Sequence, residues 1–176
     1  MKKILLCLFI LAATESFAQN TLTFLGIPID GLKKEMIAKL EAKGYEYDQS
    51  SDALFGEFNG RQVFISIQTI NNRVWRVCII DTQKDDEANI KIRFNRLFKQ
   101  LSNSPKYKLE YGSTLKDTDD ISYEINVHNK RYDTYFVPTD QSIHGAVWYT
   151  IAEEYGKYRI AIFYENHDNA ANGDDL

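Results

Sequence analysis

The chain has 176 residues, of which 44% are hydrophobic and 26% charged, a balance typical of a globular protein rather than a disordered or fibrous one. Its formal net charge of −4 lacks the basic footprint of a protein that binds nucleic-acid backbones, so we expect no nucleic-acid partner. Aromatic residues make up 13% of the chain, and this content favours a fold rich in β-strands.

The first eighteen residues have the three parts of a secretory signal peptide. Lys2 and Lys3 form the positive n-region, residues 4–13 form the apolar h-region, and residues 16–18 (Ser-Phe-Ala) place small residues at positions −3 and −1 of a cleavage site. The apolar run is too short for a transmembrane helix, which needs roughly 20 apolar residues. We therefore expect residues 1–18 to be removed. The mature protein would be a monomer in the periplasm or outside the cell, with no membrane span.

Cleavage at this site leaves one cysteine, Cys78, so no disulfide within the mature chain is expected. Cys78 lies in an apolar run over residues 74–80. A reactive thiol needs an electropositive and partly exposed setting, so we interpret Cys78 as a small buried hydrophobic residue.

The first part of the mature chain predicts an extended segment, a helix and a strand meander. Residues 21–31 are extended, and Asp30 is the expected N-cap of a helix over residues 32–43, whose apolar residues recur with a helical period. Strands follow over residues 45–81. Hairpin turns are expected at Asn59-Gly60 and Asn71-Asn72.

The second part repeats this order. Residues 86–102 have the clearest helical period of the chain, with Asp86 or Asp85 as the cap. Residues 166–176 have almost no apolar content and predict a disordered tail. Strands are expected over residues 107–111, 121–127, 131–137, 146–153 and 158–165.

These elements predict a single α+β domain over residues 19–165, with an antiparallel sheet and two helices packed on one face. A helix–meander unit used twice would divide it into halves at residues 22–82 and 83–165. Two Val-Trp pairs, at Val74-Trp75 and Val147-Trp148, are the sequence markers of such a duplication.

Residues 24–31 (Phe-Leu-Gly-Ile-Pro-Ile-Asp-Gly), followed by a helix and the exit Lys43-Gly44-Tyr45, resemble the start of small exported proteins common in Bacteroidetes. That group is uncharacterised, so the resemblance implies export but no catalytic residues. The layout is also similar to the helix-plus-antiparallel-sheet tandem of β-lactamase inhibitor proteins, a likeness of fold that implies no function.

Local motifs for catalysis or metal binding are missing from the sequence. It contains no nucleophile elbow, phosphate-binding loop or dinucleotide fingerprint, and its histidines lack metal-ligand spacing. An acidic loop over residues 116–120 fails the EF-hand pattern, because Ser122 and His128 stand where Gly and Glu are required. We therefore expect no cofactor, no metal and no identifiable catalytic residue. A catalytic carboxylate pair defined only in space stays open.

Aromatic residues in the second half are the remaining candidates for a binding surface. Tyr and Trp suit such surfaces because a rigid apolar ring carries a polar tip, although they suit sheet cores equally well. Trp148 and Tyr149 point to opposite faces of a strand, so only one of them can share a face with Tyr135. The candidate surface comprises Arg131, Tyr135, Trp148, Tyr149 and Tyr158, with Lys157 nearby.

The sequence thus favours an exported, non-catalytic binding or inhibitory module for an unidentified protein or glycan. The alternatives are a periplasmic or secreted hydrolase without a recognisable motif and a structural component of the envelope. An exposed aromatic sheet face would favour binding, whereas a cleft with converging carboxylates of shifted pKa would favour an enzyme.

The predicted cleavage site makes the mature protein begin at Gln19, because the small residues Ser16 and Ala18 are what the processing protease accepts. N-terminal sequencing or the intact mass of exported protein should show this start. A mature species that retains Met1, or that carries a lipid on Cys7, would contradict the assignment.

Overall fold

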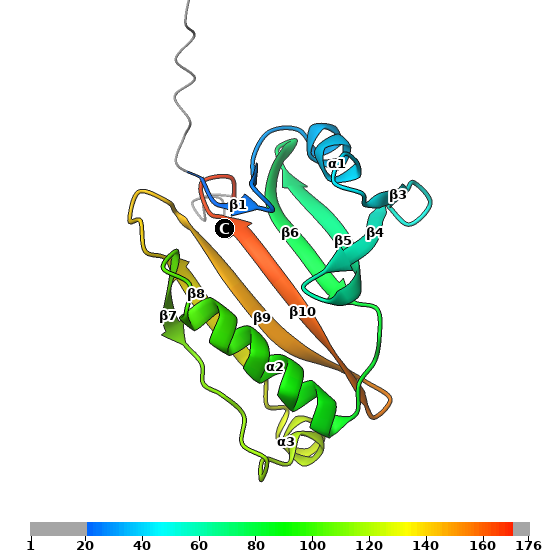
Figure 1. Ribbon diagram of the computed structural model, residues 1–176, viewed down its shortest axis with the longest axis vertical. Coiled ribbons are helices and arrows are strands. Elements are labelled where there is room, and N and C mark those ends of the chain that lie inside the picture. The colour runs from blue at the N-terminus through cyan, green and yellow to red at the C-terminus, as the bar shows by residue number, and fades with distance from the viewer. Residues whose placement is uncertain (1–20, 171–176) are drawn as a thin grey trace, which may run out of the picture.

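The computed structural model describes residues 21–170, so the predicted signal peptide and the end of the predicted tail lie outside the described residues. Eight strands form one antiparallel sheet in the order β3-β4-β5-β6-β10-β9-β8-β7, and helices pack on one of its faces (Figure 1). The expected α+β class with an antiparallel sheet is therefore confirmed.

The first half begins with a small hairpin and continues as a helix and four strands. Its elements are β1 (Thr23–Phe24), β2 (Ile27–Pro28), α1 (Lys33–Glu41), β3 (Glu46–Asp48), β4 (Ala53–Phe58), β5 (Arg61–Ile70) and β6 (Arg73–Asp81). The Asn-Gly and Asn-Asn turns occur where predicted, and all four of their residues have positive φ, as tight hairpins require.

Asp30 does not cap α1, contrary to the sequence prediction. The N-cap position is Leu32, which makes no side-chain hydrogen bond. Gly31 has a φ of +75° and turns the chain between Asp30 and the helix. The Asp30 carboxylate accepts hydrogen bonds from the Arg73 guanidinium instead, at 2.8 to 3.0 Å, and so ties the start of β6 to the segment before α1.

The second half has one helix more than expected. Its elements are α2 (Glu87–Ser102), β7 (Tyr107–Tyr111), α3 (Ile121–His128), β8 (Asp133–Pro138), β9 (Gly145–Glu154) and β10 (Lys157–Asn166). Asp86 caps α2 as predicted, since its carboxylate accepts a hydrogen bond from the Asn89 backbone N–H at 2.8 Å.

The predicted strand over residues 121–127 is wrong, because these residues form α3. The Asp120 carboxylate caps the helix by accepting from the Tyr123 backbone N–H, and Asn129 ends it in the left-handed conformation. Capping at both ends therefore outweighs the strand preference of the Ile, Tyr and Val side chains in this segment.

The predicted start of the disordered tail at Asn166 is too early. Asn166 ends β10 and donates a side-chain hydrogen bond to the Ile29 carbonyl at 2.8 Å. Asn169 donates to Asp30 and to the Val74 carbonyl. Side-chain amides thus hold residues 166–170 against the first half, although the segment offers little apolar surface to bury.

The topology repeats a helix followed by four antiparallel strands, and the two copies join through β6 and β10. The Val-Trp pairs are not the equivalent positions, since Trp75 lies on the fourth strand of its half and Trp148 on the third. Trp148 precedes the turn between β9 and β10 by the same number of residues as Phe64 precedes the turn between β5 and β6. Phe64 is therefore the counterpart of Trp148 in the first half.

The core lies between the helices and the sheet face that they cover, called here the inner face. From α1, Met36 and Leu40 are buried, and from α2 the ring of Phe94 contacts Tyr149 with centroids 4.8 Å apart. Phe24 of the small hairpin packs against Phe58 and Tyr164. Both halves therefore contribute to one continuous core.

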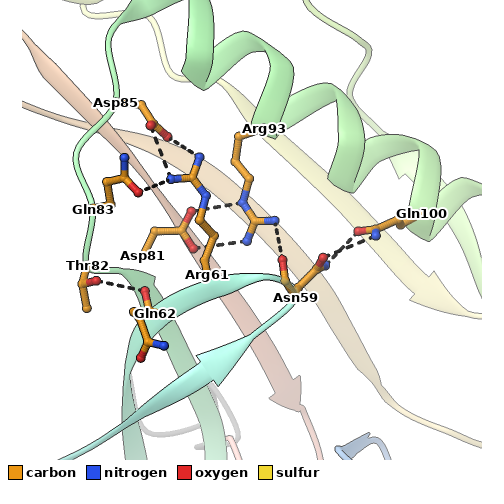
Figure 2. Close-up of polar contacts among 9 residues, drawn as sticks. All are labelled: Asn59, Arg61, Gln62, Asp81, Thr82, Gln83, Asp85, Arg93 and Gln100. Atoms are coloured by element: carbon orange, nitrogen blue, oxygen red, sulfur yellow. Dashed lines mark hydrogen bonds and ion pairs between the residues drawn. The ribbon is translucent and has the colours of Figure 1, made fainter.

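A buried polar cluster fastens the first half to α2 (Figure 2). The Arg93 guanidinium donates to both carboxylate oxygens of Asp81, at 3.1 and 3.2 Å, and both side chains are almost fully buried. Arg93 also donates to the Asn59 carbonyl in the turn between β4 and β5. Beside it, Arg61 forms an ion pair with Asp85 at 2.9 Å.

Arg93→Met should destabilise the protein by about 3–5 kcal/mol, because it leaves the Asp81 carboxylate buried without its partner. Arg96→Met is the matched control, since Arg96 is an exposed arginine of the same helix, and it should change stability by less than about 0.5 kcal/mol. Unfolding free energies from denaturant titration give both values. Equal losses in the two variants would contradict the structural role of the cluster.

Candidate functional site

The sheet face opposite the helices, called here the open face, carries a row of aromatic side chains. Tyr111, Tyr135, Trp148 and Phe163 are successive cross-strand partners on β7, β8, β9 and β10. The rings of Tyr111 and Tyr135 stack with centroids 5.4 Å apart, and those of Trp148 and Phe163 stack at 4.0 Å. The row therefore consists of two ring stacks standing side by side.

The first half supplies the counterpart of this row. Phe55, Phe64 and Ile80 are cross-strand partners on β4, β5 and β6, and the two phenyl rings lie 5.7 Å apart. Phe55, Phe64 and Tyr111 are 40%, 46% and 52% exposed. We call the two rows together the open-face band: Phe55, Phe64, Ile80, Phe163, Trp148, Tyr135 and Tyr111.

An apolar band of this kind is unusual on an uncovered sheet face. In an antiparallel sheet with one face in solvent, residues alternate along each strand, so that polar side chains normally occupy the solvent face. Contiguous exposed apolar surface on a soluble protein commonly marks an interaction site. Scattered single rings would need no such explanation. Here cross-strand pairing makes the side chains of each row neighbours, and the two rows meet diagonally where β6 pairs with β10. The band is therefore the strongest candidate site on the described residues.

A polar cluster borders the band at Glu165, whose side chain is 8% exposed. Glu165 Oε1 accepts a hydrogen bond from Trp148 Nε1 at 2.7 Å and lies 2.6 Å from an Arg76 guanidinium nitrogen. His167 Nε2 lies 3.3 Å from Glu165 Oε2. The cluster therefore fixes the Trp148 indole and leaves the Glu165 carboxylate fully engaged.

Glu165 is held ionised by these partners. Burial alone would raise the pKa of its carboxyl, but the hydrogen bonds from His167 and Trp148 and the Arg76 charge outweigh burial and lower the pKa below its usual value. A carboxyl with a lowered folded-state pKa stabilises the fold at neutral pH and loses that contribution as the pH falls through this pKa. Glu165 therefore acts as a structural anion beside the band.

Arg76 extends the contact to the second tryptophan. Its guanidinium carbon lies 4.0 Å from the centroid of the Trp75 ring and 5.5 Å from that of Phe163. A cation over an aromatic face is attracted by the ring quadrupole. Arg76 therefore links the Trp75 ring to Phe163, whose ring stacks on that of Trp148.

The structure brings together part of the surface predicted from the sequence. Tyr135 and Trp148 are neighbours on the open face. Tyr149 and Tyr158 point instead to the inner face, where they are 0% and 2% exposed, and the Tyr149 hydroxyl donates to the Phe94 carbonyl. Arg131 is exposed before β8 and pairs with Asp133, and Lys157 is exposed at the start of β10.

Sequence reasoning missed most of the band. Phe163 lies on β10, a central strand that is apolar on both faces, so alternation along the strand does not reveal which face is open. Phe55 and Phe64 could have been found, because both flank the Asn59-Gly60 turn at positions that must point to the same face. Tyr111 follows a bulge in the pairing of β7, which its sequence does not announce.

The other buried carboxylates of the described residues are held by arginines. Asp81 binds Arg93 and Asp85 binds Arg61, as Figure 2 shows. Within residues 21–170, no three His, Cys, Asp or Glu side chains are grouped so that they could hold a metal ion. In the same part of the chain, no helix is both long and apolar enough to cross a membrane.

Comparison of the chain with protein-family models, with curated proteins and with solved structures finds no match. The resemblance of residues 24–45 to small exported proteins therefore stays a prediction.

Cys78 lies on the open face as the cross-strand partner of Phe163, and it is 6% exposed. Burial raises the pKa of its thiol to about 11, against a smaller opposing effect of Arg76. At pH 8 roughly one thiol in a thousand is then ionised, so labelling by a thiol reagent should be slow in native buffer and fast in denaturant. Fast stoichiometric labelling of the folded mature protein would mean that the side chains around Cys78 do not cover its thiol.

Proposed function

We propose that the protein is an exported, non-catalytic binding module that engages its partner through the open-face band. The observation that carries this proposal is the band itself, two adjoining rows of aromatic and apolar side chains on a sheet face that no described element covers (Figure 1). Transfer of apolar surface out of water lowers the free energy, so burying these side chains against a partner stabilises the complex.

The ring geometry favours a protein partner over a glycan. Sugar rings bind by lying flat on an accessible aromatic face, but the faces in this band are turned toward one another in the Tyr111–Tyr135 and Trp148–Phe163 stacks. Side chains stand roughly perpendicular to a sheet, so the stacks present ring edges to a partner. Edges and neighbouring aliphatic groups suit the loops or strands of a folded protein.

The length of the band is also suited to a protein. It runs from β4 to β7 across the sheet, and with strands about 4.8 Å apart this distance is roughly 30 Å. A protein interface of standard size covers about 800 Å² on each side, which needs a surface of these dimensions. A single sugar ring would cover only a small part of it.

The state of the charged groups supports binding rather than hydrolysis. Among residues 21–170, the buried carboxylates are Asp81, Asp85 and Glu165, and each is bound to a guanidinium. A general acid needs a raised pKa and a place beside the substrate, whereas the pKa of Glu165 is lowered. No observed feature favours a role as a structural component of the envelope over a binding role.

The test uses immobilised mature protein (residues 19–176) and an envelope extract divided into untreated, protease-treated and periodate-treated portions. Tyr111→Ser combined with Tyr135→Ser removes one ring stack from the band. Tyr155→Asn is the control, because Tyr155 is 95% exposed in the turn between β9 and β10, and Asn tolerates its positive φ.

We expect the wild type and the control to retain the same species and the double variant to retain at least about tenfold less, since losing two interface tyrosines commonly costs more than 1.4 kcal/mol. Protease should abolish retention and periodate should not. Retention that survives protease but not periodate would show that the partner is a glycan and not a protein. Equal retention by all three proteins would refute the open-face band as the binding site.

A further inference from the structure

A cleft of about 310 Å³ lies on the inner face, between α2 and the sheet at the junction of the two halves. Leu97 of α2, Tyr149 of β9 and Ile162 of β10 line it and are almost fully buried. Phe58 and Leu101 line it as well and are partly buried. The cleft is thus an apolar recess whose lining comes from both halves of the fold.

The polar groups of the cleft are neutral. Its remaining lining residues are Asn59, Gln100, Ser104, Tyr107 and Tyr164, so no charged side chain of the described part of the chain lines it. Asn59 and Gln100 bond to each other through their side-chain amides at 2.8 Å, a contact between the turn after β4 and α2 (Figure 2). A charged ligand would have no counter-ion here and would lose its hydration, so the lining excludes ions.

Two tyrosines that line the cleft, Tyr107 and Tyr164, have hydroxyl groups available to a ligand. Among residues 21–170, neither the Tyr107 nor the Tyr164 hydroxyl has a hydrogen-bond partner, in contrast to the Tyr149 hydroxyl, which donates to the Phe94 carbonyl. Neither of the two is sealed from solvent. Burial and the neighbouring Tyr107 raise the pKa of Tyr164, so its hydroxyl stays protonated and can donate.

We propose that this cleft binds an uncharged small molecule with an apolar body of one or two rings, or a short alkyl chain, and one hydroxyl group. A cavity of about 150 Å³ accommodates benzene, so this cleft has room for a second ring. The apolar lining buries the body of the ligand, and Tyr107 and Tyr164 bond its hydroxyl. Ligand pockets commonly combine an apolar lining with a few such polar groups.

Three probes test this chemistry at pH 7: 2-naphthol, naphthalene and 2-naphthoate. Amide chemical shifts of the labelled mature protein should respond to 2-naphthol at Leu97, Leu101 and Ile162 and not at the Trp148 indole on the other face. We expect naphthalene to bind about two- to tenfold more weakly, the value of one hydrogen bond. The charged 2-naphthoate should bind at least about tenfold more weakly than 2-naphthol.

Variants separate the hydroxyls from the shape of the cleft. Tyr107→Phe with Tyr164→Phe should weaken 2-naphthol about two- to tenfold and leave naphthalene unchanged. Leu101→Trp should fill the cleft and abolish binding of all probes, whereas Leu109→Trp, at an exposed leucine outside the cleft, should not. A thermal melt confirms that each variant is folded.

The proposal is overturned if 2-naphthol shifts no cleft residue at 1 mM, if 2-naphthoate binds as tightly, or if Leu101→Trp retains binding. The outcome is independent of the open-face band, because the cleft lies on the opposite face of the sheet, and failure here leaves that function untouched.

Discussion

The antiparallel pairing of β6 with β10 is the constraint on which the rest of the structure depends. It joins two units of one helix and four strands into a single eight-stranded sheet, and in each unit it covers the edge that would otherwise be open to unwanted pairing. Its register also sets both faces at once. Ile79 meets Ile162 on the inner face, while Cys78 meets Phe163 and Arg76 meets Glu165 on the open face.

Two different kinds of surface follow from this one register. The inner face is filled by α1, α2 and the small N-terminal hairpin, and a buried arginine–aspartate pair binds α2 to the end of β6. No helix within residues 21–170 packs on the open face, so its side chains either face water or are covered by a partner (Figure 1). Stacked rings and a satisfied Glu165 cluster make this face rigid, and a rigid surface loses little conformational entropy on binding.

Much of the fold could be predicted because its signals are local. The Asp86 cap, the helical period of α2 and the Asn-Gly turn each act within a few residues, and all three occur as predicted. The predictions that are wrong concern segments whose structure depends on distant contacts or on competing local signals. Asp30 binds Arg73 on β6 instead of capping α1. Residues 121–128 have strand-forming side chains, but capping at both ends makes them a helix. Asn166 and Asn169 hold residues 166–170 against the first half by side-chain hydrogen bonds. For the candidate site, alternation separates Trp148 from Tyr149, but only the sheet order shows that Tyr135 and Trp148 meet Phe163.

Hydroxyl-radical footprinting of the isolated mature protein tests most directly whether the open face is uncovered. Phe55, Phe64 and Tyr111 are 40% to 52% exposed, whereas Phe94, Phe136 and Tyr149 are at most 1% exposed on the inner face. An uncovered open face predicts that the first three rings are oxidised at least about ten times faster than the last three, since oxidation rates follow solvent access. Similar rates for the two sets, or protection of Phe64 and Tyr111, would contradict it.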